Sequence, residues 1–283
     1  MAKLELGIIS GVWDGTPVGR EEGMRKVKEI GFDSYDIFED PLDMTKEEQA
    51  RIKELADELE LPIRSCVCVN FALVDFNPSV QRFALDRGRA YIEQAKLYGA
   101  RNVVLVIGEY YWDDEVIPKD GVWQIAVDNV KTLAQDADAA GVDLVIELEP
   151  FTQALVKDVP ELVRFVKDVG HPRVKANADI SHLHLARTEF SDVALMTGMI
   201  GHVHLSDCDG EVHGDLPPGR GKTPIKEYLQ AVIDTGLDDA TVALELEYSP
   251  DPANIVAWVE EAYESSARIL DELGVRSLSG SAA

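Results

Sequence analysis

Cysteines, long apolar runs and a leader-like start are scarce or missing in this chain. Its 283 residues include three cysteines, Cys66, Cys68 and Cys208. This odd number with one C-x-C pair fits neither a disulfide framework nor a zinc ribbon, so we expect buried, unpaired thiols. No stretch approaches the roughly 18 apolar residues that a membrane helix needs, and the first residues lack the pattern of a signal peptide. These absences predict a soluble, cytoplasmic protein without a membrane partner.

Positive charge is also scarce. Lys+Arg total 27 against 52 Asp+Glu, which gives a formal net charge of −25. Such a chain repels polyanions, and no local basic patch interrupts the acidic composition, so nucleic acid is excluded as a partner. The length suits two average domains or one large α/β barrel.

Short apolar runs alternate with long amphipathic runs along the chain. The apolar runs predict strands at Leu4–Ser10, Ser34–Glu39, Ile63–Asn70, Asn102–Ile107, Val142–Glu149, Val174–Asp179, His202–Ser206 and Thr241–Glu247. The amphipathic runs predict helices at Arg20–Ile30, Lys46–Leu59, Ser79–Tyr98, Gly121–Ala140, Val159–Val169, Pro224–Thr235 and Pro252–Leu273, with a weaker one at Phe190–Met196. Glycines directly follow several of these helical patterns, as expected of C-terminal caps.

Eight β–α units in this order predict a parallel sheet that closes on itself. The expected fold is α/β, a single (β/α)8 TIM barrel over residues 1–276 with its active site at the C-terminal mouth. A doubly wound open sheet is the alternative, but it usually has five or six strands, and no G-x-G-x-x-G follows the first strand here. Residues 277–283 (SLSGSAA) are predicted to form a flexible tail.

Ligand-type side chains stand at the ends of four successive predicted strands. In the fifth strand the leucine and isoleucine positions share one face, so Glu147 and Glu149 share the other. The same alternation turns Asp179, His204 and Glu245 away from the helices. Because the helix-facing side of a barrel strand must be apolar, these polar side chains are expected to point inward at the C-terminal mouth.

Several buried carboxylates that lie close together require a counter-charge. Lys175, four residues before Asp179 on the same face, supplies only one positive charge. A divalent cation would balance two of the three negative charges, and its predicted ligands are Glu147, Asp179, His204 and Glu245. Oxygen-rich ligation with one imidazole favours Mn²⁺, with Mg²⁺ or Co²⁺ as alternatives. For any one carboxylate, the competing interpretation is a helix cap or a salt bridge.

Further candidate substrate-binding residues surround the predicted mouth. They are His182, Glu149, Lys175, Glu109, Trp112, Trp13, His213 and Arg220. Aromatic side chains after a strand can wall a sugar pocket, and residues on a loop over the mouth can contact substrate. Ordinary packing or pairing is the alternative for each. His184 and His202 are expected to be structural.

Four motifs resemble those of the xylose-isomerase-like barrels, a family that includes ketose 3-epimerases, inosose isomerases and dehydratases, and endonuclease IV. The resemblance covers nearly the whole chain. The family's G-V-x-L-x-x-E, D-x-x-H, G-H-x-H and final-strand glutamate match, in that order, Gly141–Glu147, Asp179 with His182, Gly201–His204, and Glu245.

This resemblance implies that Glu147 and Glu245 flank the substrate as an acid/base pair beside the metal. The expected activity is that of a divalent-metal-dependent isomerase or epimerase of a keto-sugar or related polyol ketone. A glutamate would abstract a proton to give a metal-stabilised enediolate, and its partner would return the proton. The alternative is a lyase, in which the same enolate expels a leaving group, as in an inosose-type dehydratase or a subunit cleaving 3-oxo-glycosides or C-glycosides. A homo-oligomer is expected, with a second subunit as the alternative.

Two positions depart from the ketose 3-epimerase pattern. Gly210 stands where those enzymes have an arginine, and Gln153 stands where they have a second glutamate. The segment 207–221 is also longer than theirs and carries His213 and Arg220. These departures keep the lyase alternative open. The charge disfavours an endonuclease IV-like hydrolase, and a metal-free, non-catalytic barrel acting as a partner subunit is the remaining alternative.

Overall fold

Eight parallel strands form a closed barrel in which each strand pairs with its sequence neighbours and β1 pairs with β8. The computed structural model describes residues 3–108, 118–247 and 249–276. The strands are β1 Glu5–Ile9, β2 Ser34–Ile37, β3 Ile63–Val69, β4 Asn102–Val106, β5 Asp143–Ile146, β6 Val174–Asp179, β7 Ile200–Leu205 and β8 Thr241–Leu244. The predicted fold class is therefore confirmed.

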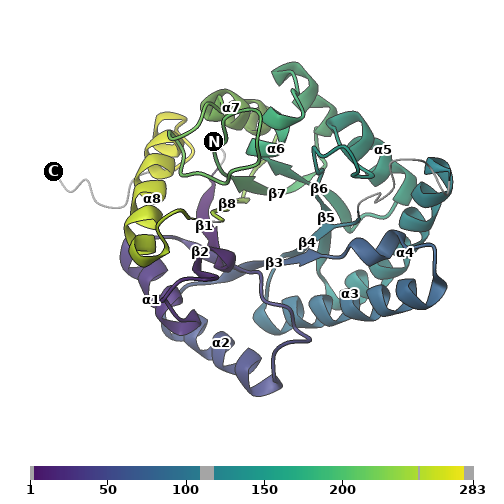
Figure 1. The fold of residues 1–283 in the computed structure, drawn as a ribbon, viewed down its shortest axis with the longest axis horizontal. Coiled ribbons are helices and arrows are strands. Elements are labelled where there is room, and N and C mark those ends of the chain that lie inside the picture. The colour runs from purple at the N-terminus through teal and green to yellow at the C-terminus, as the bar shows by residue number, and fades with distance from the viewer. Residues whose placement is uncertain (1–2, 109–117, 248, 277–283) are drawn as a thin grey trace.

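Helices surround the barrel as an outer ring (Figure 1). The α-helices are α1 Arg20–Ile30, α2 Lys46–Glu58, α3 Pro78–Tyr98, α4 Lys119–Ala140, α5 Val159–Val169, α6 Ile180–Leu185, α7 Ile225–Asp234 and α8 Ile255–Glu272. Short 3₁₀ helices lie at η1 Ser10–Trp13, η2 Phe71–Val74, η3 Phe190–Met196 and η4 Pro252–Asn254. The weak pattern at Phe190–Met196 thus forms a 3₁₀ helix, and α6 was not predicted because it begins directly where β6 ends.

Local signals explain where several helices begin and end. Thr45 and Glu48 form a reciprocal capping box at the start of α2. Asp158 accepts a hydrogen bond from the backbone N–H of Glu161 at the start of α5. At the end of α4, Gly141 has a φ of 75° and closes the helix in the left-handed conformation, as its position predicted.

Two apolar clusters divide the core. The large one lies between the sheet and the helices, and it includes the outward-facing Leu144 and Leu244. The small one lies inside the barrel and consists of Ile9, Val67, Val104, Val145 and Ala243, with Phe38 packed against it. This separation confirms the alternation predicted for β5 and β8. The inner cluster packs the centre of the barrel with apolar side chains, as barrels of this size require.

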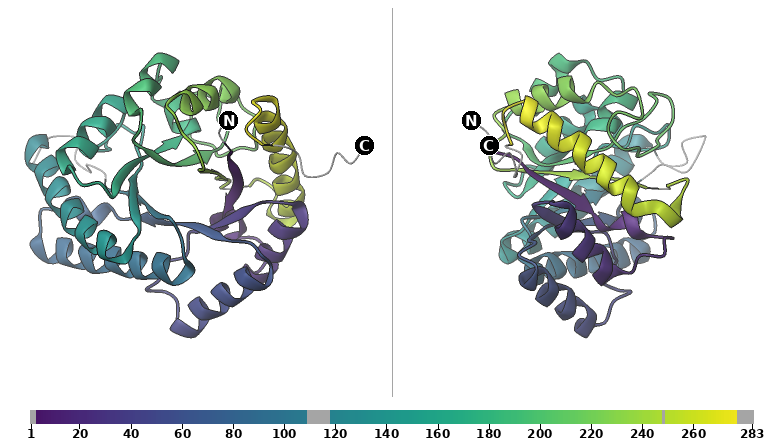
Figure 2. Two further views of the ribbon diagram at one scale, coloured as in Figure 1. Left: turned by 180° about the vertical axis from the view of Figure 1, so that it is seen from behind. Right: turned by 90° about the vertical axis from the view of Figure 1, so that its left-hand side faces the viewer.

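The two ends of the described chain lie together at the N-terminal end of the barrel. The backbone N–H of Leu4 donates to the carbonyl of Val275 over 3.1 Å, and the right-hand view of Figure 2 shows the start of β1 and the end of α8 on the same side of the barrel. The C-terminal mouth is therefore formed by the loops that follow the strands. Among the described residues, no helix combines the length and the hydropathy needed to cross a bilayer.

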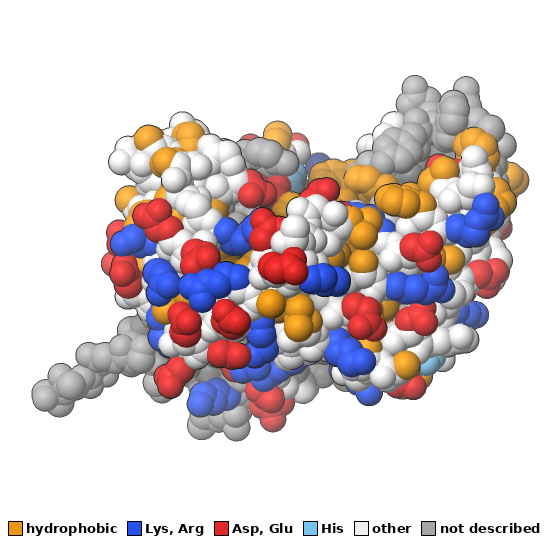
Figure 3. All heavy atoms as spheres, turned by 90° about the horizontal axis from the view of Figure 1, so that it is seen from below, with side chains coloured by type: hydrophobic (Ala, Val, Ile, Leu, Met, Phe, Trp, Pro, Cys, Tyr) orange, Lys and Arg blue, Asp and Glu red, His pale blue; other side chains and the backbone are white. Residues whose placement is uncertain are grey.

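Charges of both signs mix on the outer surface. Figure 3 shows Lys/Arg and Asp/Glu side chains interspersed over one side of the molecule. Ion pairs such as Arg51 with Glu21 at 3.0 Å and Arg89 with Asp136 at 2.9 Å connect neighbouring helices there. The three cysteines are buried and unpaired, as predicted.

Candidate active site at the barrel mouth

Four ligand-type side chains from successive strands converge at the mouth. Asp179 ends β6 and His204 lies in β7, and the two are register partners. Glu147 and Glu245 are the first residues after β5 and β8. One ligand atom from each of the four lies within 4.8 Å of the others. We refer to these four residues as the carboxylate–histidine cluster.

The donor atoms in this cluster face one another without hydrogen bonds. Nδ1 of His204 lies 2.9 Å from Oε1 of Glu147 and 3.1 Å from Oε2 of Glu245, but neither contact is aligned as a hydrogen bond. Oδ2 of Asp179 and Oε2 of Glu245 are also buried without a hydrogen-bond partner. Buried polar atoms in folded proteins are normally paired. Unpaired anionic and imidazole donors that converge in this way suit a bound divalent cation.

The atoms that do not face the cluster are held by the protein. Oδ1 of Asp179 accepts from the backbone N–H of His182 at 2.7 Å and from Oγ of Ser181 at 2.9 Å. Nδ2 of Asn177 donates to Oε1 of Glu147 over 2.7 Å. Such supporting hydrogen bonds fix the orientation of ligand groups. Sequence alternation placed Asn177 inward without giving it a role, and no sequence signal indicated Ser181.

Burial and mutual charge set the electrostatics of the cluster. Burial alone would lower the pKa of His204, but the adjacent Glu147 and Glu245 raise it well above its usual value. Burial raises the pKa of Glu245 well above its usual value despite His204. For Glu147, burial acts in the same sense, but His204 outweighs it and lowers the pKa. The cluster has one imidazole for three carboxyls, and the charge of the neighbouring His182 also lowers the pKa values of Asp179 and Glu147. A bound cation would add the positive charge that keeps Glu245 ionised as well.

His182 lies beside the cluster, one turn into α6. Its Nδ1 is 2.9 Å from the carbonyl oxygen of Leu148, so Nδ1–H donates there and Nε2 faces the other way. Nε2 lies 3.0 Å from Nε2 of His213. Burial would lower the pKa of His182, but the charges of Asp179 and then of nearby Glu149 raise it to about 10. These three predicted substrate-binding residues are therefore neighbours in the structure.

The two histidines expected to be structural each have a partner within the fold. Nε2 of His202 lies 2.9 Å from Oδ2 of Asp36, and both side chains are buried inside the barrel. Nδ1 of His184 lies 3.1 Å from Oγ1 of Thr223. The ring of His202 also packs against that of His204, with the ring centroids 5.3 Å apart, so His202 lies directly beside the carboxylate–histidine cluster.

Two of the predicted substrate-binding residues form ion pairs elsewhere in the fold. Lys175 pairs through Nζ with Asp143 at 2.7 Å, because four residues of strand separate it from Asp179 by about 13 Å toward the N-terminal end. Arg220 points outward, pairs with Glu261 at 2.7 Å and stacks on Trp258 of α8. These placements correct both predictions.

Of the remaining candidates Trp13, Glu109 and Trp112, the structure describes only Trp13. Trp13 is buried in the outer core, where its indole leaves no space for a side chain at Gly23 of α1. Its packing interpretation therefore replaces the pocket-wall prediction. Glu109 and Trp112 lie outside the described residues.

Two cavities lie in different parts of the fold, and neither is lined by a residue of the carboxylate–histidine cluster. One of about 310 Å³ lies on the β1–β3 side of the mouth, with Phe38, Val67, Asp14, Glu39 and Arg87 among its lining residues. Phe38 and Val67 belong to the inner apolar cluster, so this cavity reaches the centre of the barrel. Sequence reasoning gave its charged residues no role. Asp14 lies in a loop whose direction no periodicity predicts, and Glu39, which the sequence places at the end of a strand, follows the end of β2 at Ile37.

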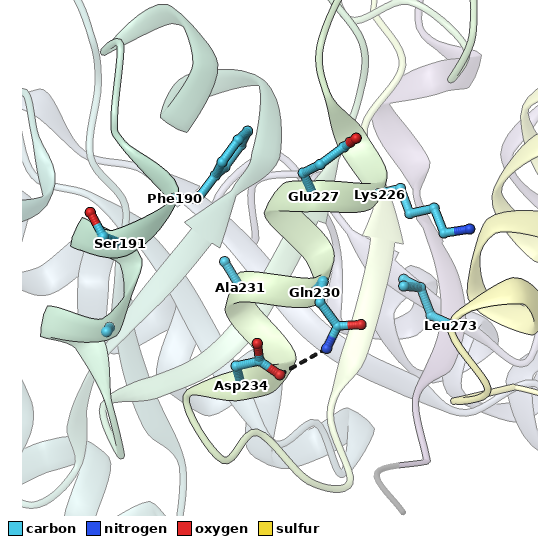
Figure 4. Close-up of a pocket in the computed structure, with 9 residues that line it drawn as sticks. Phe190, Ser191, Lys226, Glu227, Gln230, Ala231, Asp234 and Leu273 are labelled. Carbon is cyan, nitrogen blue, oxygen red and sulfur yellow. Dashed lines mark hydrogen bonds between the residues drawn. The ribbon is translucent and has the colours of Figure 1, made fainter.

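The larger cavity, of about 640 Å³, lies outside the barrel between η3, α7 and the end of α8 (Figure 4). Phe190 and Lys226 lie on opposite sides of it, and Gln230 donates to Asp234 within α7 over 2.8 Å. No residue of the carboxylate–histidine cluster lines it. We therefore place the candidate active site at the mouth, despite the larger volume of this outer groove.

Comparison with known proteins gives consistent results. A family model described as "Xylose isomerase-like TIM barrel" matches residues 24–273. D-psicose 3-epimerase of Ruminiclostridium cellulolyticum is 29% identical over 231 residues, which cover 77% of this chain and 75% of that protein. Fructoselysine 3-epimerase of Shigella flexneri is 25% identical over 266 residues, which cover 89% and 94%. Among solved structures, the IOLI protein with a bound zinc atom has a TM-score of 0.81 at 16% identity and covers 95% of this chain and 99% of that one.

Proposed function

The chain belongs to the xylose isomerase-like TIM barrel family, and from this premise we propose that it is a divalent-metal-dependent epimerase or isomerase of a keto-sugar or related polyol ketone. The observation that carries the proposal is the carboxylate–histidine cluster, whose unpaired donor atoms converge within 4.8 Å at the barrel mouth. The two related 3-epimerases support a reaction at a carbon next to the ketone.

Glu147, Asp179, His204 and Glu245 would hold the metal ion, for which Mn²⁺ is our proposal. The donor set fits: three carboxylates and one imidazole match the preference of Mn²⁺ for oxygen-rich sites. When bound, such an ion supplies Lewis-acid polarisation of substrate oxygens. The hydrogen bonds from Asn177 and Ser181 keep Glu147 and Asp179 oriented toward the centre.

Glu147 and Glu245 are the proposed acid/base pair. They follow β5 and β8, and both reach Nδ1 of His204, so they approach the centre of the mouth from different strands. One carboxylate would take the proton from the carbon beside the ketone, which leaves an enediolate. The other would return a proton on the opposite face for epimerisation, or at the neighbouring carbon for isomerisation.

The remainder of the substrate would extend toward the cavity on the β1–β3 side. That cavity combines apolar contacts from Phe38 and Val67 with charged groups of both signs. A sugar has apolar C–H faces and a rim of hydroxyl groups, so such a lining suits it. His182 and Glu149, beside the cluster, are proposed to bind substrate oxygens near the reacting carbon.

A lyase is the second candidate, and the segment 207–221 favours it. This segment brings an additional imidazole, His213, within 3.0 Å of His182. A group that can donate a proton there would assist a leaving group on the β-carbon of the enolate. Gly210 and Gln153, the two departures from the ketose 3-epimerase pattern, point the same way.

Deuterium exchange separates these outcomes. The purified protein, loaded with Mn²⁺, is incubated in D₂O with a panel of ketoses, inososes and 3-oxo-glycosides, and the products are analysed by mass spectrometry and NMR. Deuterium incorporation with retention of all other atoms identifies an epimerase or isomerase, whereas release of water or an aglycone identifies a lyase. Absence of exchange with every member of the panel would contradict the proposal.

The oligomeric state is a separate prediction. We expect a homo-oligomer, with the need for a second subunit as the alternative, and light scattering of the purified protein tests this.

A further inference from the structure

The segment 207–221, which we call the mouth loop, is fastened at its base by one carboxylate. Oδ1 of Asp207 accepts from the backbone N–H groups of Cys208 and Thr223 at 2.8 and 3.0 Å. Oδ2 accepts from those of Gly219 and Gly221, each at 2.8 Å. A carboxylate that binds four N–H groups holds the two ends of a loop together, because each bond is charge-assisted.

Further contacts make the mouth loop rigid. Asp207 and Leu216 form an antiparallel bridge with bonds of 2.8 and 2.9 Å. A Cβ at Gly221 would lie 2.3 Å from Oδ1 of Asp207, so only glycine permits this closure. Arg220 ties the outer side of the loop to Glu261 of α8. The far part of the loop is thereby presented to the mouth in a defined position.

That far part carries a histidine–aspartate pair. Nε2 of His213 lies 3.3 Å from Oδ1 of Asp215. Asp215 is fully buried, accepts a hydrogen bond from Oγ of Ser206 over 2.9 Å, and has a second oxygen, Oδ2, without a hydrogen-bond partner. It also has a φ of 39°, which is costly for a residue other than glycine. The fold thus holds a strained, buried carboxylate behind His213.

His213 itself lies where a substrate would pass. Its ring centroid is 4.9 Å from that of His182 in α6 and 5.6 Å from that of Phe151, whose ring is nearly perpendicular to it with an interplanar angle of 89°. The side chain of His213 is 27% exposed, whereas Asp215 and Ser206 are fully buried. A molecule that enters the mouth can therefore reach the imidazole but not the groups behind it.

We propose that His213 is a substrate-binding residue of this enzyme, a hydrogen-bond partner for a substrate oxygen beside His182, and that Asp215 is the residue that positions it. The inference rests on the proposed function, because it assumes an oxygen-rich substrate at the carboxylate–histidine cluster. Asp215 and His182 both face Nε2 of His213, at 3.3 and 3.0 Å, so Nδ1 is the ring nitrogen left for a substrate oxygen. Phe151 packs against the ring, and Asp207 fixes the loop that carries it. The ligand atom is a hydroxyl or carbonyl oxygen, since imidazole can donate to or accept from either.

The test compares three single variants on the substrate that the exchange panel identifies. His213→Gln is expected to lower kcat/KM by roughly 10²-fold, because a buried hydrogen bond to the reacting molecule is lost. Asp215→Asn, which keeps the shape of the side chain, is expected to cost roughly 10-fold. Glu211→Gln, an exposed change in the same loop, is the matched control and should leave kcat/KM unchanged. Mn²⁺ affinity, measured by calorimetry, should be the same in all three variants as in the parent protein.

A double-variant cycle separates positioning from a merely structural effect. If Asp215 acts through His213, then adding Asp215→Asn to His213→Gln causes no further loss, whereas an independent structural role gives multiplied losses. Full activity of His213→Gln, or multiplied losses in the double variant, would overturn the inference while leaving the proposed function intact. Failure of the proposed function is distinct, because the parent protein itself would then show no exchange. Circular dichroism of each variant confirms that it is folded.

Discussion

Charged side chains at the mouth have different partners in the two halves of the barrel. At the β1–β4 side, charged side chains at the mouth form pairs within the protein: Arg20 with Glu39 at 2.8 Å, and Arg87 with Asp40 at 2.7 Å. The inner apolar cluster has members from both halves, since Val145 lies in β5 and Ala243 in β8. At the β5–β8 side, donor atoms of Asp179, His204 and Glu245 are buried without hydrogen bonds.

This difference teaches how a site can be distinguished from a merely polar interior. A paired charge serves the fold, because its desolvation is offset by its partner. Unpaired, converging donors are costly to bury, and they remain only where a ligand completes them or where function requires them. We therefore propose that the β5–β8 half carries the chemistry, and substitutions in the two halves should have different effects.

Turnover should depend on the β5–β8 glutamates most strongly. Glu147→Gln or Glu245→Gln is expected to lower kcat by roughly 10³-fold or more, because the general acid or base is lost. Asp143→Asn, at the opposite end of β5, is the matched control, since its partners Lys175 and Arg173 lie away from the mouth. Steady-state kinetics on the identified substrate provide the measurement. Equal losses in the control would remove the distinction between the two ends of the strand.

Substitution of a metal ligand should weaken Mn²⁺ binding, whereas substitution of a buried side chain next to the ligands should not. Asp179→Asn and His204→Ala are each expected to weaken Mn²⁺ binding by at least about 100-fold, more than the loss of a supporting group typically causes. His202→Asn, which alters the buried pair with Asp36, should keep the metal. Calorimetric titration of chelator-treated protein measures the affinities. A His202 variant that loses metal as readily as the His204 variant would contradict the ligand assignment.

Part of this site was predictable because strand alternation is a strong constraint. In β5 and β8 the apolar partners of Glu147 and Glu245 must face the helices, so the glutamates had one direction left. Helix limits such as Arg20–Ile30 and Val159–Val169 followed from capping residues and glycine stops. These features are local, and local physics dictates them.

The rest depends on contacts between distant segments. The roles of Asp207 and Asp215 follow from the path of the mouth loop, and no periodicity in its sequence encodes that path. Lys175 and Arg220 were assigned to the mouth by position, but long side chains reach whichever carboxylate is nearest, here Asp143 and Glu261. The sequence does not show which carboxylate will be nearest to such a side chain in the fold.

Stability in the absence of metal should fall when a paired charge is removed from either half. Arg87→Met is expected to lower the free energy of unfolding by about 1–3 kcal/mol, because Asp40 and the carbonyl of Val69 lose their donor. Asp179→Asn should also lower it at neutral pH: burial acts to raise the pKa of Asp179, but His182 and His204 outweigh it and hold that pKa at about 2, so the ionised carboxylate stabilises the fold. Asparagine can still cap α6, which limits the loss. Urea unfolding with a chelator present measures both. An Asp179→Asn variant as stable as the parent protein would contradict this electrostatic role.

The cysteine thiols of the two halves should differ least, because all three are expected to react slowly. Burial raises the pKa of Cys68 to about 12 and that of Cys66 well above its usual value. Cys208, in the mouth loop of the other half, is also fully buried. All three are expected to alkylate with iodoacetamide at neutral pH at least about 100-fold more slowly than in denatured protein. Selective rapid labelling of Cys208 would show that the mouth loop opens, contrary to the rigid loop described above.

Diffraction from crystals soaked in Mn²⁺ tests the central claim most directly. An anomalous difference map is expected to show one strong peak per chain, enclosed by Glu147, Asp179, His204 and Glu245. A map with no peak there, with these carboxylates instead turned toward arginines or ordinary water, would contradict the claim that the cluster exists to hold a cation.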